Sequence, residues 1–160
     1  MSDVPEAATL IARAASLRPL LERNAEKTDG QRRLPDEVVQ ALKETGLCAL
    51  MVPRRFGGYQ TSVRTYIDVM SELGRGCGST AWVASLINVC AWLAALFPER
   101  AQSDVWESNP DAWAAGSLAP NGEATPVDGG WRVNGRWPWA SGSLHAQWGA
   151  CGIHMKNERG

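Results

Sequence analysis

The sequence predicts an α+β fold, with an amino-terminal all-α helical bundle followed by the beginning of an antiparallel β domain. Two observations support this prediction. Apolar residues recur at helical spacing from the start of the chain to about Asn109. After Asp111, short apolar runs alternate with turn dipeptides such as Asn134-Gly135, a pattern typical of antiparallel strands. We therefore expect a helical domain over residues 1–110 and an incomplete β domain over residues 111–160.

Composition and charge exclude several kinds of partner. With 44% apolar and 21% charged residues, the 160-residue chain has the profile of a globular protein. Sixteen basic and seventeen acidic residues give a net charge of −1, without a long block of either sign. Such a chain has no field that would hold nucleic acid or an anionic membrane. Its first residues lack the basic and apolar regions of a secretory signal, so we expect a cytoplasmic protein.

The cysteine and histidine pattern predicts no metal site. The four cysteines, at positions 48, 77, 90 and 151, form no CxxC pair, and we expect them to be free thiols. The chain has two histidines, His145 and His154, both in the second half, so no Ser-His-Asp arrangement can be proposed. Composition and periodicity therefore predict a fold but no reaction.

The first helical stripe contains Pro19, which should kink or divide its helix because proline cannot donate a hydrogen bond to Ala15. The stripe consists of Leu10, Ala14, Leu17 and Leu21. A second helix is expected from Pro35 to Gly46, because proline favours the first turn and glycine the residue beyond the last. Its expected inner face comprises Val38, Ala41, Leu42 and Thr45.

A third helix is expected after Thr61 or Ser62, either of which can cap its first turn. Its expected inner face comprises Val63, Ile67, Met70 and Leu73. Glycines at positions 74, 76 and 78 then end it. This glycine run follows a helix and lacks the lysine of a phosphate-binding loop. We interpret it as a helix end followed by a capping residue, Ser79 or Thr80, for the next helix.

The segment from Thr80 to Phe97 contains no charged residue, and its 18 residues reach the lower limit for a membrane span. Its polar residues and the charged residues that follow argue against a span. We predict instead a helix buried on all sides of a bundle. One more short helix, around Trp106, is expected before Pro110.

The second half predicts four strands separated by turn residues. The expected strands are Trp113 to Leu118, Trp131 to Val133, Arg136 to Ala140 and Gln147 to His154. Pro120-Asn121-Gly122 and Asp128-Gly129-Gly130 are the expected turns. The last five residues, 156–160, are interpreted as the turn of a hairpin without a second strand. A sheet that stops there has an unpaired edge, so we expect the chain to be part of a longer protein.

Several phrases in the helical half resemble the amino-terminal domain of acyl-CoA dehydrogenases. They are Leu34-Pro35-Asp36-Glu37, Gly46-Leu47, Val52-Pro53 and Phe56-Gly57-Gly58-Tyr59. The run from Val133 to Gly142, VNGRWPWASG, resembles the segment of their middle domain that contacts the flavin. This likeness implies that the second half begins a β-barrel. It also implies a carboxyl-terminal helical bundle that completes the flavin pocket and builds a homotetramer.

Three other phrases are more similar to the oxygenase components of two-component aromatic hydroxylases, a branch of the same family. They are GCGSTAW at 76–82, ALFP at 95–98 with Ala101-Gln102, and SGSLHAQW at 141–148. This resemblance implies a monooxygenase that receives reduced flavin, FMN or FAD, from a separate reductase. Oxygen would then form a C4a-hydroperoxide that hydroxylates a small aromatic or polyketide-like substrate. We expect residues 1–160 alone to be inactive, because the flavin pocket would be incomplete.

The resemblance also implies roles for individual residues. Trp139 would pack on the isoalloxazine, and Ser141 would hydrogen-bond near flavin N5 and act as the catalytic residue that helps hold the peroxide. The backbone from Leu118 to Pro120 would pass along the flavin. Oxygenase relatives often place a histidine in the long apolar helix before a tryptophan, where this chain has Cys90 before Trp92. We expect these two residues to bind substrate, and the missing imidazole implies a substrate other than a simple phenol.

Two alternatives to the oxygenase stay open. One is an acyl-CoA dehydrogenase with tightly bound FAD, which would catalyse α,β-desaturation. Dehydrogenases commonly carry a Thr-Glu-Pro-Gly-Ala-Gly phrase where this chain reads LAPNGE at 118–123, a difference that weakens this alternative. The other is a non-catalytic helical interaction module.

Overall fold

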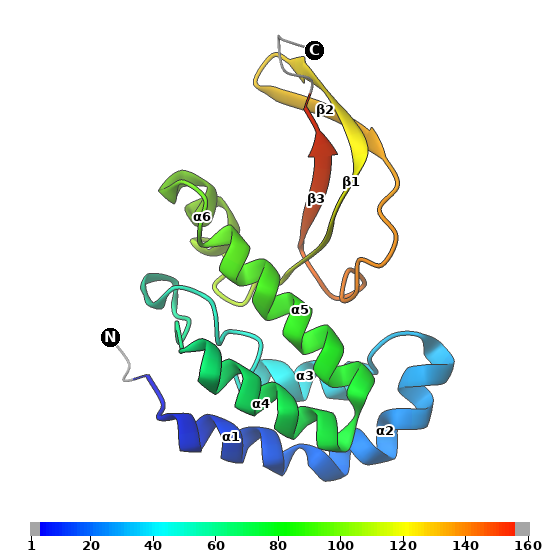
Figure 1. Cartoon of the computed structure of the whole chain (residues 1–160). Helices are drawn as coiled ribbons and strands as arrows, with labels where there is room; N and C mark the ends of the chain where they lie inside the picture. Colours follow the sequence, from blue (N-terminus) through cyan, green and yellow to red (C-terminus); the bar gives the residue numbers. More distant parts are fainter. Residues whose placement is uncertain (1–3, 156–160) are drawn as a thin grey trace.

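The computed structural model describes residues 4–155 and has the predicted α+β architecture, with helices first and a sheet after them (Figure 1). The helices are α1 (Ala7–Ser16), α2 (Arg18–Gln31), α3 (Asp36–Glu44), the 3₁₀ helix η1 (Arg54–Phe56), α4 (Val63–Gly76), α5 (Gly78–Ala94) and α6 (Glu99–Trp106). The strands are β1 (Ala114–Val127), β2 (Gly130–Gly135) and β3 (Trp148–His154). Within the described part of the chain, no helix combines the length and apolarity needed to cross a membrane.

Pro19 divides the first helical stretch, as predicted. It lies in the first turn of α2, where its missing N–H removes no helical hydrogen bond. The two helices run nearly end to end along one side of the helical block (Figure 1). The predicted stripe is confirmed, because all four of its members are buried: Leu10, Ala14, Leu17 and Leu21.

The second predicted helix is α3, and its end is set by Gly46. This glycine has a φ of 70°, a conformation that other residues rarely adopt, and the Tyr59 hydroxyl occupies the place of a Cβ. Val38 and Leu42 are fully buried, while the other two residues of the predicted face are partly buried. The Arg13 guanidinium donates to the Thr45 carbonyl oxygen at 3.2 Å, which ties α1 to the end of α3.

The third predicted helix is α4, and its cap is Ser62, whose Oγ accepts a hydrogen bond from the Thr65 N–H at 3.1 Å. The predicted inner face is half wrong, because Val63 and Ile67 are 60% and 49% exposed. The buried residues of α4 are Thr65, Val69, Met70 and Leu73. This stripe is the one that faces both α1 and α5, against which α4 packs. Residues 63 and 67 lie to one side of it.

The long uncharged helix is α5, and the prediction of burial on all sides is wrong. Trp82 and Trp92 are 60% and 46% exposed. The buried residues recur at helical spacing on one face: Thr80, Ala84, Ile87, Asn88, Cys90 and Ala91. A helix without charge can therefore still have one uncovered face. The predicted cap is also wrong, since the N-cap is Cys77 in extended conformation, without a capping hydrogen bond from its side chain.

The strands form one sheet in the order β2-β1-β3. The hairpin from β1 to β2 turns at Asp128-Gly129, as predicted, and pairs Val127 with Gly130 in antiparallel fashion. The predicted break at Pro120-Asn121-Gly122 is wrong, because β1 continues through it. These residues instead mark a register shift in the pairing of β1 with β3.

Two further strand predictions need correction. Residues 136–140 form an irregular segment with a turn at 138–139 instead of a strand, and Pro138 among them cannot donate a ladder hydrogen bond. The segment from residue 136 to residue 147 leads from β2 to the opposite edge of β1. Consequently β3 runs parallel to β1, and the sheet is mixed instead of antiparallel. The turn predicted at 156–160 lies outside the described residues.

The main core lies among the helices, while the sheet extends away from them (Figure 1). Trp113, just before β1, is buried in that helical core, and the Lys43 ammonium lies 5.3 Å from the centre of its ring. All of β2 is exposed. The domain division near residue 110 stays a prediction; the last helix ends at Trp106 and the first strand begins at Ala114.

Candidate functional site

A cavity of about 530 Å³ lies where the helical half meets the segment between β2 and β3. Its walls come from the end of α2, the start of α5 and the turn around residue 140. The lining residues are Thr28, Asp29, Arg32, Arg33, Leu34, Gly78, Ser79, Trp82, Val83, Trp139 and Ser141. This volume is within the roughly 300–1,000 Å³ typical of small-molecule sites. The structure therefore places Trp139 and Ser141 in one cavity shared by both halves of the chain.

Trp139 has an unusual backbone conformation. Its φ is 65°, which is rare for a bulky residue and costs on the order of 1–3 kcal/mol. The Ser141 N–H donates to the Trp139 carbonyl oxygen at 2.9 Å and closes the turn. The indole is 88% exposed, so it presents a large planar face that no described residue covers. Strain of this kind at a cavity wall is typical of functional sites.

Ser141 accepts a hydrogen bond from a residue of the helical half. The Trp82 indole N–H donates to Ser141 Oγ at 3.2 Å, across 59 positions of sequence. The next residue, Gly142, has a φ of 88°, and a Cβ there would lie 3.3–3.5 Å from side-chain atoms of Val83 and Ile87. The turn thus rests on α5, and glycine allows both its conformation and its close approach.

Leu118 and Pro120 lie in β1 and are exposed, Leu118 by 66%. The pairing of β1 with β3 is interrupted between Ser117 and Gly122, and the pairing with β2 begins only at Gly122. Residues 118–121 therefore have no ladder partner on either side. The carbonyl oxygens of Leu118 and Ala119 lie against Gly152 of β3, and neither Leu118 nor Pro120 lines the cavity of Trp139 and Ser141. The passage of this run along a flavin therefore stays a prediction.

Cys90 does not line the cavity of Trp139 and Ser141. It is only 7% exposed and faces the start of β1. Burial raises the pKa of this thiol, and the nearby Gly116 backbone only partly offsets the effect. Cys90 is therefore a neutral, mostly enclosed group in the described structure. Its role in substrate binding stays a prediction.

Trp92 lines a second cavity, of about 900 Å³, at the opposite end of α5 from Trp82. Ten residues of helix separate the two indoles, a rise of about 15 Å. The second cavity is formed with the loop before α4, which contributes Arg54 and Gln60 among others. The structure therefore does not bring Trp92 together with Trp139, and the proposed substrate role of Trp92 stays a prediction.

The cavity of Trp139 and Ser141 has an aromatic half and a charged half. Arg32, Arg33 and Asp29 line the charged half together with the first residues of α5, where helical N–H groups lie free of a side-chain cap. Arg33 is paired with Asp36 at 3.0 Å. The exposed indole and the Ser141 hydroxyl together fit a planar heteroaromatic ring with polar edges, such as a flavin. Within residues 4–155, no cluster of three or more His, Cys, Asp or Glu side chains could hold a metal ion.

His145 lies near the same junction. Burial lowers its pKa from 6.5, and the charges of Arg33 and Lys43 lower it further, while Asp36 acts in the opposite direction. The imidazole is therefore neutral at pH 7. His145 lies where the segment before β3 meets α3, which carries Asp36 and Lys43.

Of the residues that line this cavity, sequence reasoning selected only Trp139 and Ser141; Trp82, Arg32 and Arg33 are among those it missed. Trp82 belongs to the uncharged helix and was expected to be buried. The signal that could have identified it is its spacing, since it is offset from the stripe of Thr80, Ala84 and Ile87. The two arginines follow α2 in a segment without periodicity. Only the folded chain places them beside the turn around residue 140.

Comparisons with known proteins agree on a family. The model of the acyl-CoA dehydrogenase N-terminal domain matches residues 12–107. The chain is 42% identical over 140 residues to the oxygenase subunit HsaA of a flavin-dependent monooxygenase from Rhodococcus jostii, covering 88% of this chain and 37% of the relative. It is 40% identical over 157 residues to the oxygenase component of an FADH2-dependent resorcinol hydroxylase from a Rhizobium species, covering 94% and 38%.

Among solved structures, the fold matches XiaF from a Streptomyces species, in a complex with FADH2 and glycerol. The TM-score is 0.88 at 34% identity, and the match covers 91% of this chain and 37% of that one. The chain thus spans less than two fifths of the length of these relatives.

Proposed function

Since the chain belongs to the acyl-CoA dehydrogenase family, we propose that it carries the flavin-facing and substrate-facing part of a flavin-dependent monooxygenase, an oxygenase component. The observation that carries this proposal is the single cavity in which the strained, exposed Trp139 lies beside Ser141. The relatives described above, one named as FADH2-dependent, support reduced flavin as the cofactor. Their description as oxygenase subunits or components supports a separate reductase as partner.

In this proposal each residue of the chain has a physical task. The Trp139 indole covers one face of the flavin ring and excludes water from it. Ser141 offers its hydroxyl at the polar edge of the ring, near N5, and residues 118–120 offer backbone groups. When bound, reduced flavin supplies the oxygen chemistry by forming a C4a-hydroperoxide with O2. The chain positions the flavin, excludes water from it and provides hydrogen bonds to it.

The proposed substrate is a small aromatic or polyketide-like compound. The relative named as a resorcinol hydroxylase supports an aromatic substrate. Cys90 and Trp92 on α5 are the proposed substrate contacts, and the absence of histidine at position 90 favours a substrate that needs no imidazole. A homotetramer in the cytoplasm completes the proposal, and the tetramer rests on the resemblance of the sequence phrases.

The test supplies the full-length protein, not residues 1–160 alone, with FMN or FAD, an unrelated NADH-dependent flavin reductase, O2 and a panel of phenols and polyketide-like aromatics. Hydroxylated product that requires both reductase and oxygenase is the expected result. Desaturation of an acyl-CoA with an artificial electron acceptor, and no hydroxylation, would favour the dehydrogenase. Failure to bind either flavin would favour an interaction module.

A further inference from the structure

The contact between Trp82 and Ser141 has a chemical consequence for the candidate site. An indole N–H can only donate, whereas a serine hydroxyl has one proton and two lone pairs. Because Trp82 donates to Ser141 Oγ at 3.2 Å, one lone pair is occupied by the protein. The hydroxyl proton and the second lone pair remain for a ligand in the cavity. Trp82 therefore limits how Ser141 can be oriented.

The backbone around both residues is fixed by its own contacts. Trp82 lies in the second turn of α5, and the Ser85 hydroxyl donates to its carbonyl oxygen at 2.8 Å. On the other side, the Ser141 N–H closes the Trp139 turn, and Gly142 lies against Val83 and Ile87. A hydrogen bond between two anchored groups loses little conformational freedom when it forms. It can therefore hold a rotatable hydroxyl in one orientation.

The Trp82 ring can act on the candidate site through its hydrogen bond to Ser141. Both Trp82 and Ser141 line the same cavity as Trp139. No other hydrogen bond of the Ser141 side chain is present among residues 4–155. Without Trp82, the hydroxyl would be free to turn toward water or toward the backbone of its own turn.

We propose that Trp82 is a positioning residue: its indole N–H orients the Ser141 hydroxyl so that the proton of that hydroxyl is directed to the flavin edge. This inference rests on the proposed function, in which Ser141 contacts the flavin. Trp82 acts through Ser141 and transfers no proton itself. Its loss matters only while the Ser141 hydroxyl is present.

The first arm of the test compares the full-length wild-type protein with its Trp82→Phe, Ser141→Ala and double variants. The readout is coupling, the share of oxidised flavin that yields hydroxylated product instead of hydrogen peroxide. Each single variant should raise the ratio of peroxide to product by about fivefold, as expected for loss of one hydrogen bond. The double variant should be no worse than Ser141→Ala alone. Trp131→Phe, on β2, is the matched control and should not change coupling.

Multiplied effects in the double variant would overturn the proposal, and so would wild-type coupling in Trp82→Phe. The second arm needs no flavin. In protein labelled with 5-fluorotryptophan, the ¹⁹F signal assigned to position 82 should shift in Ser141→Ala and stay in place in Ser143→Ala. An unmoved signal in Ser141→Ala would contradict the contact. If the wild-type protein forms no hydroxylated product, the proposed function fails, while the fluorine arm still decides the contact.

Discussion

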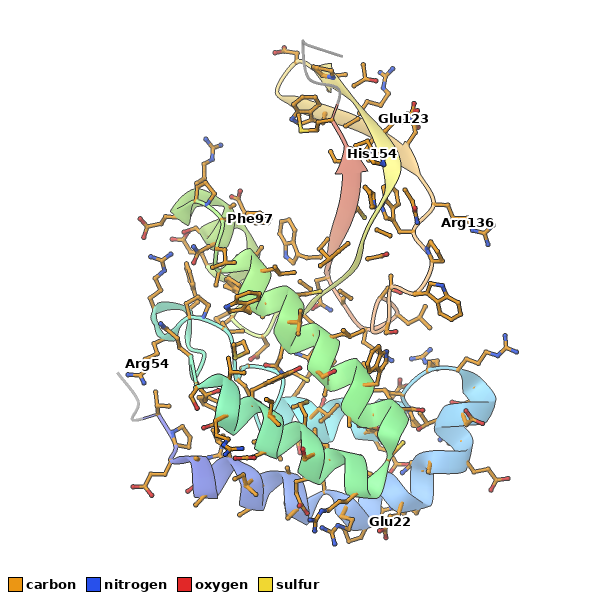
Figure 2. All side chains as sticks on the ribbon, in the orientation of Figure 1. Glu22, Arg54, Phe97, Glu123, Arg136 and His154 are labelled. Carbon is orange, nitrogen blue, oxygen red and sulfur yellow. The ribbon has the colours of Figure 1, made fainter. Side chains whose placement is uncertain are left out.

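The Trp137 indole N–H donates to the Gly152 carbonyl oxygen at 2.6 Å, joining the segment that follows β2 to strand β3. The Trp137 ring lies over the paired glycines Gly122 and Gly135, and a Cβ at Gly135 would be 2.7 Å from its Cη2 atom. Figure 2 shows the neighbouring Arg136 pointing away from the helices. Trp137 thus fixes the chain two residues before Trp139 and so helps to place the turn at the candidate site.

Gly122→Ala should displace Trp137, because a Cβ at this position would collide with the ring atom Cζ2. We expect a loss of about 1–3 kcal/mol in the free energy of unfolding, the usual cost of overpacking. Flavin affinity should fall as well, since the Trp139 turn follows directly. Urea unfolding and a flavin titration measure the two effects. Gly130→Ala is the control, because nothing lies within 4 Å of its Cβ position; equal stability of both variants would contradict the account of Trp137.

Asn88 in α5 is fully buried and connects three backbone groups. Its Oδ1 accepts from the Met51 N–H at 3.2 Å, and its Nδ2 donates to the carbonyl oxygens of Leu47 and Ala84 at 2.9 and 3.0 Å. Asn88→Ala should lower the free energy of unfolding by about 2–4 kcal/mol, because it leaves buried backbone groups unpaired and a small cavity. Ser85→Ala, on the same helix, should cost much less. A loss below that of the control, measured by urea unfolding, would show that the network contributes nothing.

His145 predicts a pH dependence of stability. Its pKa is lowered in the folded chain from 6.5, so below pH 6.5 the unfolded state binds the proton first. The free energy of unfolding should therefore decrease as the pH falls from 7 toward the lowered pKa. His145→Gln should flatten this slope, while His154→Gln, at an exposed position, should leave it unchanged. Unfolding midpoints between pH 5 and pH 7.5 measure both; identical slopes for wild type and His145→Gln would refute the prediction.

Local rules predicted most helix boundaries from the sequence. Pro19 and Gly46 act through their own backbone geometry, and Ser62 through a hydrogen bond three residues away, so their effects need no knowledge of the fold. Burial was harder to predict. Val63 and Ile67 are apolar at helical spacing yet exposed, because the face that α4 buries depends on where α1 and α5 lie.

The candidate site was predicted in part. The resemblance selected Trp139 and Ser141, and the structure places both in one cavity. Spacing places Trp82 off the buried stripe of α5, but it could not predict the bond to Ser141, because that bond spans 59 residues and forms only when the turn lies on α5. The parallel pairing of β3 with β1 could not be predicted from the sequence either. Turn residues predict where strands end but not which edge of the sheet the next strand joins.

We propose that the cavity around Trp139 binds a reduced flavin. Anaerobic titration of the full-length protein with reduced FMN and FAD compares wild type, Trp139→Ala and the control Trp131→Ala. Loss of the stacking indole should weaken flavin binding by roughly tenfold, as expected for about 1–1.5 kcal/mol of aromatic contact. Trp139 is 88% exposed, so unfolding should be unchanged in that variant. Equal flavin affinity in all three proteins, or no binding by the wild type, would contradict the account.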